Sequence, residues 1–584
     1  MRIVQLFTVI TVLAVTAFGT MAQQAADTVA PEADTGISVK PPVIAKRQMV
    51  VSANPHATRA GLEILRKGGS AADALVAVQT VLGLVEPQSS GIGGGGFLVW
   101  FDAKTGEITT IDGRETAPAT ATNDLFLGPD REPLKFFDAV IGGRSVGTPG
   151  IVRLMELIHK RHGKLPWDNL FGFAAKLAEE GFEVSPRLAG LIAYDRERLF
   201  SQASTRSYFF DTAGNPLQEG HVLKNIDYGE AMRSLAQSGP DAFYTGAIAD
   251  SIINTIQLHP GNPGELTVED LTAYRARERD AVCAPYRDYE VCGMGPPSSG
   301  ALTVGQILAM IEPFDLAELG PNDPVTWRII GDATRLAFAD RGRYMADSDF
   351  VKMPSGLLDK DYLASRSALL IRQDALPQEE VKPGEPPWDK AELRLDGAEF
   401  EMPSTTHFVI VDDDGNVASM TSSIENAFGA RQMASGFLLN NQLTDFSFVA
   451  ERDGQAVANR VEPGKRPRSS MSPTIILKDG KPVFALGSPG GSNIIPYVAK
   501  TIVALVDWKM NPQEAVSLPH LTNRFGRYDV EEGTVAEALA PDLEAFGFKV
   551  AARSLNSGLH VVAFTENGLE GGADPRREGL AAGD

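Results

Sequence analysis

The chain is poor in the residues that usually build metal sites. Its 584 residues include two cysteines and eight histidines, and neither CxxC nor HExxH spacing occurs. We therefore expect no metal. Positive charge is also scarce, because 54 lysines and arginines are set against 75 acidic residues, for a net charge of −21. This charge argues against nucleic acid or an anionic membrane surface as a partner.

Long apolar runs are confined to the N-terminus. Met1-Arg2 supplies a positive end, Ile3–Phe18 is almost wholly apolar, and Thr20-Met21-Ala22 offers a small-residue cleavage site. This pattern predicts a signal peptide at 1–22, followed by a disordered linker at 23–45. The alternative is an uncleaved anchor, although the apolar run is short for a membrane span. We expect a periplasmic or secreted protein with no membrane span after signal removal.

The two cysteines, Cys283 and Cys292, flank a segment that resembles a short hairpin. A two-residue loop at Arg287-Asp288 would pair position 283 with 292 as a non-hydrogen-bonded pair, in which Cα atoms approach to about 4.5 Å. An oxidising compartment makes a cross-strand disulfide one expectation. Two free buried thiols are the other, because Arg-Asp is not a favoured hairpin turn.

A glycine-rich segment, Gly91–Gly96, matches the GxGxxG pattern of dinucleotide-binding folds. That fingerprint needs a strand before it and a helix after it. Here the order is reversed, because Ser70 caps a helix predicted at 71–84 and a strand predicted at 97–101 follows the glycines. We expect a loop beneath a functional site, where backbone passes close to backbone.

A predicted hairpin begins near Thr405. The preceding segment, 376–404, is rich in Pro, Gly and charge, which predicts a flexible linker. Alternating residues then lead into an Asp-rich turn at 412–416 and a returning strand that ends at Ser423. A three-residue loop pairs 405 with 423, and a two-residue loop pairs 406 with 423. Either register places the Ser423 hydroxyl close to Thr405.

Thr405 is a candidate nucleophile. A Thr hydroxyl reacts readily only with a base beside it, and cutting the chain before Thr405 would supply its own α-amine as that base. The alternative is an ordinary hairpin whose Thr and Ser residues are strand formers. His407 shares the face of Thr405, and we assign it a structural role.

Two later segments add chemistry. Leu438–Phe446 places Asn, Gln and Asp between apolar residues, where polar groups need partners. Lys465–Pro473 leads into strands predicted at 474–477 and 483–486. The second strand ends in Gly487–Ser492, whose backbone N–H groups can stabilise an oxyanion.

Together these segments resemble the gamma-glutamyltransferase (gamma-glutamyl transpeptidase) family of N-terminal-nucleophile hydrolases. The resemblance covers nearly everything after the leader. The motifs that carry it are EPQSSGIGGGGF at 86–97, DGRETAP at 112–118, GTPG at 147–150, PPSSG at 296–300, AFADR at 337–341, TTHF at 405–408, NNQLTDFS at 440–447, KRPRSSMSP at 465–473 and GSPGGS at 487–492.

The resemblance implies roles for the matching positions. Thr405 matches the nucleophile, which is freed by self-cleavage of the Ser404–Thr405 bond. Ser423 stands where many members have a Thr that hydrogen-bonds the nucleophile. Gly490 and Gly491 match the residues that form the oxyanion hole of the family. The implied substrate-binding positions are Arg114, Ser469 and Ser470 for the α-carboxylate of the gamma-glutamyl group, and Glu425, Gln442 and Asp445 for its α-amino group.

The resemblance also implies the fold: α+β, a four-layer αββα sandwich of the N-terminal-nucleophile hydrolase type, one domain built from two autocleaved chains. These chains would be a large subunit at 46–404 and a small subunit at 405–584. Helical patterns suit the two outer layers. They are predicted at 151–161, 170–180, 325–343, 493–508 and 541–546.

The implied activity is that of a gamma-glutamyltransferase and glutathione hydrolase. Thr405 would form a gamma-glutamyl-enzyme that water or an amino acid or peptide acceptor discharges, with no cofactor. One departure is the segment 446–468, which is short and lacks the Tyr of the lid loop in some members. The alternatives are a cephalosporin (glutaryl) acylase on the same scaffold and a non-catalytic secreted binding protein. Arg114, Gln442 and Asp445 favour an acyl group with both amine and carboxylate.

Overall fold

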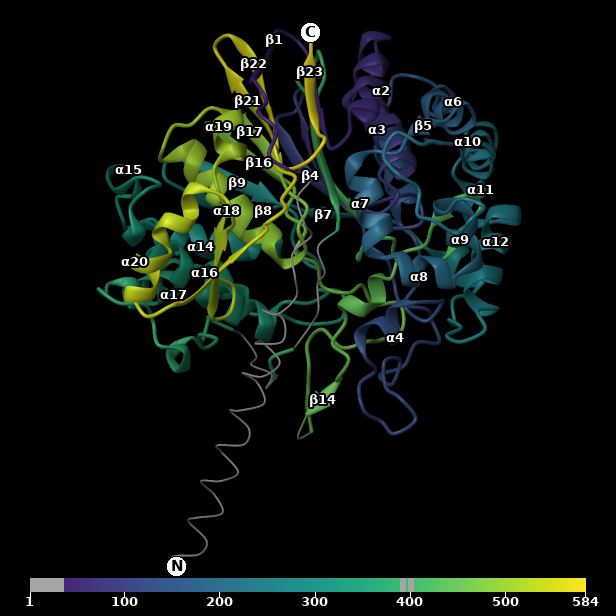
Figure 1. Ribbon diagram of the computed structural model, residues 1–584. Coiled ribbons are helices and arrows are strands. Elements are labelled where there is room, and N and C mark those ends of the chain that lie inside the picture. The colour runs from purple at the N-terminus through teal and green to yellow at the C-terminus, as the bar shows by residue number, and fades with distance from the viewer. Residues whose placement is uncertain (1–35, 389–394, 398–403, 453) are drawn as a thin grey trace, which may run out of the picture.

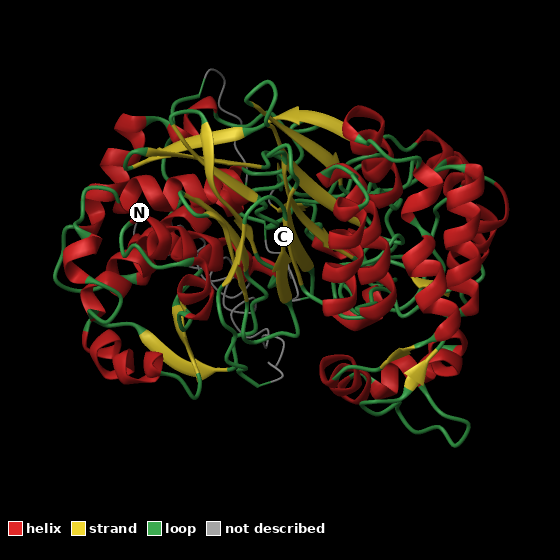
Figure 2. Ribbon diagram, turned by 90° about the horizontal axis from the view of Figure 1, so that it is seen from above, coloured by secondary structure: helices red, strands yellow, loops and turns green. Residues whose placement is uncertain are grey.

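Two seven-stranded sheets lie face to face at the centre of the protein, and helices cover the outer face of each (Figure 1, Figure 2). The computed structural model describes residues 36–388, 395–397, 404–452 and 454–584. This arrangement confirms the predicted four-layer αββα sandwich.

Each sheet contains strands from both sides of position 404. The first sheet has the order β1 (Val43–Ala45), β22 (Gly568–Ala573), β21 (His560–Thr565), β17 (Lys481–Gly487), β16 (Thr474–Lys478), β9 (Tyr289–Gly293) and β8 (Val282–Tyr286). The second has the order β23 (Leu580–Gly583), β2 (Met49–Ser52), β10 (Thr406–Val411), β11 (Val417–Ser423), β3 (Gly95–Asp102), β4 (Glu107–Gly113) and β7 (Arg277–Asp280). Because neither sheet is complete without both segments, the chain forms one folding unit.

Side-chain alternation along the strands separates the layers. In β10, Phe408 and Ile410 pack against helices, whereas Val409 and Val411 belong to the core between the two sheets. The helices over the second sheet include α2 (Pro55–Arg66), α3 (Ala71–Val85), α5 (Ile151–His162), α6 (Gly172–Glu180), α10 (Ile226–Ser238) and α12 (Gly246–Gln257). Those over the first include α14 (Gly300–Ile311), α16 (Pro324–Tyr344), α17 (Lys360–Ser367), α18 (Ile494–Val506), α19 (Pro512–Ser517) and α20 (Ala540–Ala545).

The predicted helices are present with small shifts at their ends. Ser70 caps α3 through a capping box with Asp73, as expected. The helix predicted at 170–180 begins at Gly172, because Trp167–Leu170 forms a separate 3-10 turn. None of the helices within the described ranges is long and apolar enough to span a membrane.

The glycine-rich loop lies beneath the central hairpin and joins α3 to β3, which confirms the predicted order of helix and strand. A Cβ atom on Gly93 would lie 2.1 Å from the Leu438 carbonyl oxygen, and one on Gly94 would lie 2.1 Å from the Ser423 carbonyl oxygen. Side chains are excluded here because two backbone segments pass in contact. The loop therefore supports the end of β11, and its position after a helix and before a strand is the reverse of the order in a dinucleotide site.

The chain before β2 is more ordered than expected. The predicted signal peptide and residues 23–35 lie outside the described residues, but the predicted linker at 23–45 is wrong at its C-terminal end. Val43–Ala45 forms β1 and pairs with β22, because the edge of the first sheet offers unpaired backbone groups. Lys40 also donates hydrogen bonds to three backbone carbonyls.

The predicted flexible segment 376–404 is described only in part, since 389–394 and 398–403 lie outside the described residues. Its described parts make specific contacts. Leu376 is buried in the core beneath the first sheet, and Leu395 forms a parallel bridge with Val457. Apolar burial and backbone pairing thus hold parts of a segment whose composition alone predicted flexibility.

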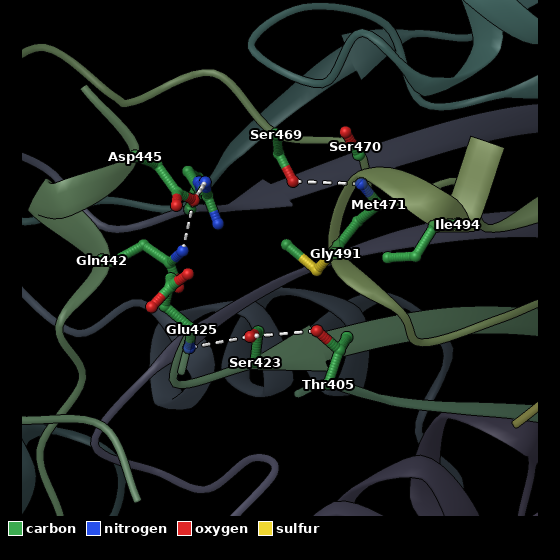
Figure 3. Close-up of a pocket in the computed structure, with 11 residues that line it drawn as sticks. Thr405, Ser423, Glu425, Gln442, Asp445, Ser469, Ser470, Met471, Gly491 and Ile494 are labelled. Atoms are coloured by element: carbon green, nitrogen blue, oxygen red, sulfur yellow. Dashed lines mark hydrogen bonds and ion pairs between the residues drawn. The ribbon is translucent and has the colours of Figure 1, made fainter. Parts of the chain in front are cut away.

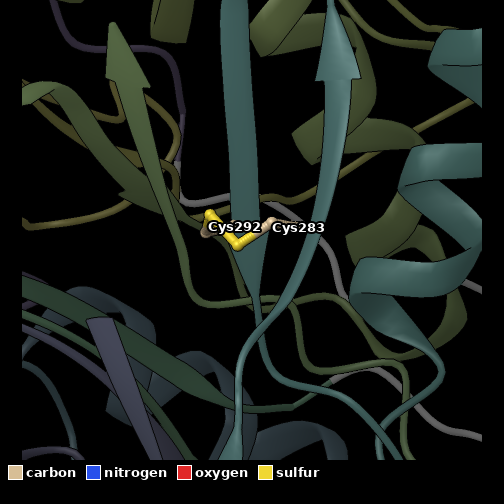
Figure 4. The surroundings of a disulfide bond; sticks show 2 residues. All are labelled: Cys283 and Cys292. Carbon is tan, nitrogen blue, oxygen red and sulfur yellow. A yellow bond between two sulfur atoms is a disulfide. The ribbon is translucent and has the colours of Figure 1, made fainter. Parts of the chain in front are cut away.

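Cys283 and Cys292 form a disulfide (Figure 4). β8 and β9 pair these two residues directly, and Tyr286 pairs with Tyr289 around the predicted Arg287-Asp288 loop. Arg287 adopts a left-handed backbone conformation, with φ of 54°, which allows this unfavoured turn sequence to close the hairpin. The disulfide prediction is confirmed and the free-thiol alternative is wrong.

Candidate active site

Thr405 lies at the start of the central hairpin of the second sheet. β10 and β11 pair Thr406 with Ser422 and close through a three-residue loop at 413–415, so position 405 is opposite Ser423. Of the two predicted registers, the one with a three-residue loop is therefore confirmed. The Thr405 Oγ1 and Ser423 Oγ atoms are 3.3 Å apart, and both residues are buried.

The Thr405 hydroxyl also contacts the peptide group that precedes it. In this continuous chain, Thr405 Oγ1 donates a hydrogen bond to the Ser404 carbonyl oxygen at 2.6 Å. Ser423 Oγ donates to the same oxygen at 3.2 Å, and Ser404 Oγ donates to the Gln88 carbonyl oxygen at 2.8 Å. The Ser404 carbonyl is thus polarised by two hydroxyls, one of which belongs to the next residue.

A pocket in front of Thr405 is lined from both sides of the 404–405 bond (Figure 3). It brings together the predicted positions Arg114, Thr405, Ser423, Glu425, Gln442, Asp445, Ser469, Ser470 and Gly491. Gly490 is adjacent in sequence but is not among the lining residues. Met471 and Ile494 add an apolar wall that sequence reasoning missed. Met471 lies inside a motif that we quoted, whereas Ile494 carried no signal beyond its position after the glycines.

Arg114 and Asp445 form a buried ion pair in this pocket. Arg114 Nη2 donates to Asp445 Oδ2 at 2.5 Å, and Gln442 Nε2 donates to the same oxygen at 2.6 Å. The Arg114 guanidinium also donates to the carbonyl oxygens of Pro467 and Arg468, at 3.1 and 2.8 Å. These contacts hold a cation and an anion side by side, which complements the carboxylate and ammonium of an α-amino acid.

Glu425 reaches the pocket from a loop just after β11. Its backbone φ is 76°, a left-handed conformation that is unusual for a residue with a side chain. The loop is held because Glu425 N donates to Ser423 Oγ at 2.8 Å and Asn441 Nδ2 donates to the Glu425 carboxylate. Sequence reasoning assigned no role to Asn441, although it lies in a quoted motif.

Glu115 is a second carboxyl group behind Arg114 that sequence reasoning left without a role. It is fully buried, and its Oε2 atom is 4.0 Å from Arg114 Nη1. Burial raises the pKa of Glu115 to about 8, although the charge of Arg114 opposes this shift. The group is therefore largely neutral at neutral pH, so Asp445 is the anion that faces the pocket beside Arg114.

The predicted oxyanion loop lies between β17 and α18. Gly490 and Gly491 have φ values of 136° and 58°, which favour glycine. A Cβ atom on Gly490 would also lie 2.9 Å from Tyr497 Cε2. The loop leads through the 3-10 turn Gly491–Asn493 into α18, whose N-terminal dipole adds positive potential at this end.

His407 is buried between the sheets, away from any role as a base. Its Nδ1 atom is 2.9 Å from Thr421 Oγ1, and its ring lies against Gly487. Burial holds the pKa of His407 well below the usual range, so the imidazole is neutral. These contacts agree with the structural role that we assigned to it.

Residues 57–584 match the family model described as gamma-glutamyltranspeptidase. The chain belongs to the gamma-glutamyltranspeptidase family. It is 38% identical over 557 residues to the glutathione hydrolase proenzyme of Escherichia coli K12, with 93% of each chain covered.

The chain is also similar to proteins named as acylases. The acylase ACY 1 proenzyme of Pseudomonas sp. V22 is 33% identical over 551 residues, which cover 92% of this chain and 94% of the relative. The crystal structure of the cephalosporin acylase from Bacillus halodurans superimposes with a TM-score of 0.81 and 26% identity, over 95% of this chain and 99% of the other. Similar chains are thus named both as glutathione hydrolases and as acylases.

Proposed function

We propose that this protein is an autoprocessing gamma-glutamyltransferase and glutathione hydrolase with Thr405 as its N-terminal nucleophile. One observation carries the proposal: the Thr405 hydroxyl is hydrogen-bonded to the carbonyl group it would attack, at the wall of a pocket that holds a buried Arg114–Asp445 pair. Family membership supports the same reaction.

In the first reaction, Thr405 Oγ1 attacks the Ser404 carbonyl carbon. The C–N bond then breaks, which leaves Ser404 esterified to the Thr405 oxygen and gives Thr405 a free α-amine. Ser423 Oγ lies 3.2 Å from the Ser404 carbonyl oxygen and supports the charge that develops there. Water hydrolyses the ester and produces a large subunit that ends at 404 and a small subunit that begins at 405.

In the second reaction, the freed α-amine takes the proton of the Thr405 hydroxyl while its oxygen attacks the side-chain amide of a gamma-glutamyl compound such as glutathione. The backbone N–H groups of Gly490 and Gly491 stabilise the tetrahedral oxyanion, and the amine returns the proton to the leaving group. Water, or the amine of an amino acid or peptide, then discharges the gamma-glutamyl ester.

Substrate recognition follows from the charges in the pocket. Arg114, Ser469 and Ser470 bind the α-carboxylate of the gamma-glutamyl group, and a guanidinium fork suits this task. Glu425, Gln442 and Asp445 bind its α-ammonium group. The buried Gln442 Oε1 atom has no hydrogen-bond partner within the described part of the chain, so it can accept from that ammonium group.

A glutaryl acylase is the second candidate. The similarity to two acylases favours it, and so does the short segment 446–468, which lacks a Tyr. Within this segment, β14 (Glu451–Arg452) pairs antiparallel with β15 (Gln455–Ala456). A glutaryl group has no α-ammonium, so it would leave the anionic half of the pocket without a partner. Gamma-glutamyl specificity is therefore the better match.

The location that we propose is the periplasm or the cell exterior. The disulfide between Cys283 and Cys292 supports an oxidising compartment, in agreement with the predicted signal peptide. A non-catalytic binding protein would need neither the nucleophile nor the glycine pair, so we set that alternative aside.

Electrophoresis and a two-substrate assay test the proposal. Purified wild type should run as two bands and hydrolyse gamma-glutamyl p-nitroanilide faster than glutaryl p-nitroanilide. Thr405→Ala should remain one band and be inactive. Thr406→Ala is the matched control, because it removes a neighbouring buried hydroxyl, and it should still cleave. An active wild type with a continuous chain would refute the mechanism, and a preference for the glutaryl substrate would establish the acylase.

A further inference from the structure

Arg577 makes a contact with the proposed nucleophile that no motif singled out. It lies in the segment 574–579, which connects β22 to β23. Arg577 Nη1 donates a hydrogen bond to the Thr405 carbonyl oxygen at 3.0 Å, and the arginine is 1% exposed. Its Nε atom also donates to Asn556 Oδ1 at 3.4 Å.

The backbone of the segment 574–579 is held by Lys40, which lies near the N-terminal end of the described chain. Lys40 Nζ donates to the carbonyl oxygens of Asp574, Arg577 and Gly579, at 2.7, 2.6 and 2.7 Å. Asp574 N also donates to the Leu559 carbonyl oxygen at 2.9 Å. These bonds fix the backbone from which the Arg577 side chain extends to Thr405.

The carbonyl oxygen that Arg577 contacts belongs to the residue whose α-amine acts as the base. Amine and carbonyl group are attached to the same Cα atom, so the guanidinium charge lies about 6 Å from the amine nitrogen. A fixed positive charge at this range disfavours protonation of the amine. A general base must be unprotonated at the working pH, so the contact acts in the direction that the reaction needs.

Other ionisable groups near Thr405 are paired, hydrogen-bonded or largely neutral. In the pocket, Arg114 pairs with Asp445, while Glu425 accepts a hydrogen bond from Asn441. Glu115, behind Arg114, is largely neutral because burial raises its pKa to about 8.

The elements that pack around the hairpin carry further charges. Arg576 pairs with Asp574 and Glu531, and Arg187 pairs with Glu86. Glu578 Oε1 accepts from Arg187 N at 3.0 Å. The two buried histidines on this side, His407 and His560, are neutral because burial lowers the pKa of each.

We propose that Arg577 is a positioning residue for the reaction: its guanidinium fixes the carbonyl group of Thr405 and keeps the freed α-amine of the same residue unprotonated. The inference rests on the proposed function, because it needs Thr405 at the start of a cleaved chain. It assigns the segment 574–579 a part in setting the pH range of activity.

The pH dependence of kcat/KM tests this role, because it reports the ionisation of the free enzyme. Arg577→Gln retains a hydrogen-bond donor but loses the charge, and Arg577→Lys retains the charge. An unperturbed α-amine titrates near 7.7–8.0, so the acid limb of the wild type should lie below that range. Arg577→Gln should move the limb upward by about one pH unit, and Arg577→Lys should leave it near the wild-type position.

Arg66→Gln is the matched control. It removes the same charge from an exposed arginine paired with Asp584, and it should leave the profile unchanged. An Arg577→Gln profile that coincides with the wild type, or a wild-type limb at or above about 7.7, would overturn the proposal. A rate that falls at every pH while the limb stays in place, as a simple loss of stability would give, would also overturn it.

A direct titration makes the test independent of turnover and of the variants. The pH dependence of reductive methylation of the wild-type Thr405 amine can be followed by mass spectrometry of the N-terminal peptide of the small subunit. A midpoint below about 7.7 supports the proposal, and one at or above about 7.7 overturns it. If the chain is never cleaved, the amine does not exist, and electrophoresis shows that the proposed function has failed first.

Discussion

The proposed preference for gamma-glutamyl over glutaryl groups can be tested at the Arg114–Asp445 pair by replacing one carboxylate oxygen of Asp445 with an amide nitrogen. Asp445→Asn preserves shape but removes a buried carboxylate that Arg114 contacts at 2.5 Å and Gln442 at 2.6 Å. The side chains of Arg114 and Asp445 are 1% and 4% exposed, so solvent screens their charges weakly. The variant therefore removes the anion proposed to bind the substrate ammonium group.

The expected size of the effect follows from the burial of this charge. Loss of one partner from a buried, hydrogen-bonded charge pair costs about 2–5 kcal/mol of binding. A cost of about 3 kcal/mol lowers kcat/KM for a gamma-glutamyl donor by roughly two orders of magnitude. A glutaryl donor has no ammonium group, so its kcat/KM should change by less than about threefold, and the ratio of the two donors should fall more than tenfold.

The assay compares gamma-glutamyl and glutaryl p-nitroanilides at one pH, with rates divided by the concentration of cleaved enzyme. This normalisation matters because Asp445→Asn also leaves Arg114 buried without its counter-ion, which destabilises the fold. Glu462→Gln is the matched control, since it removes a carboxylate that pairs with Lys465 in the same segment but does not line the pocket. Equal losses for both donors would refute the assignment of Asp445 to the ammonium group.

Three further changes test other parts of the structure. Ser423→Ala should slow self-cleavage at least tenfold, because it removes a hydroxyl 3.2 Å from the scissile carbonyl oxygen, and a time course on gels with an unchanged half-time would contradict this. Glu115→Gln, made in the uncleaved Thr405→Ala background, should become stabilising relative to its parent as the pH rises from about 4.5 to 8. The buried carboxyl has a pKa raised to about 8, so the folded state binds more protons than the unfolded state in this window and the parent loses stability as pH rises. A pH-independent difference in urea midpoint would show that Glu115 does not titrate in this range. Replacing Cys283 and Cys292 by Ser should cost about 2–3 kcal/mol of stability, and reductant should lower the urea midpoint of the wild type but not of the variant.

The amino-acid sequence alone determined the local elements of this protein. The helix cap at Ser70 and the two possible registers that bring Ser423 to Thr405 follow from turn chemistry and from the periods of strands and helices. These patterns act over about twenty residues or fewer, so no knowledge of the packing was needed. Strand alternation also made the Cys283–Cys292 disulfide one of two expectations, and the structure decided between them. The family motifs then pointed to most of the pocket.

The tertiary structure decided which distant groups meet. Arg114 and Asp445 are 331 positions apart, and they touch because strands from both segments share one sheet. The neutral state of Glu115 and the contact of Arg577 with Thr405 depend on burial between layers, which no local pattern encodes. The periodicity of helices and strands and the chemistry of turns involve residues that are close in sequence. Charge pairing and desolvation depend instead on residues that are close in space.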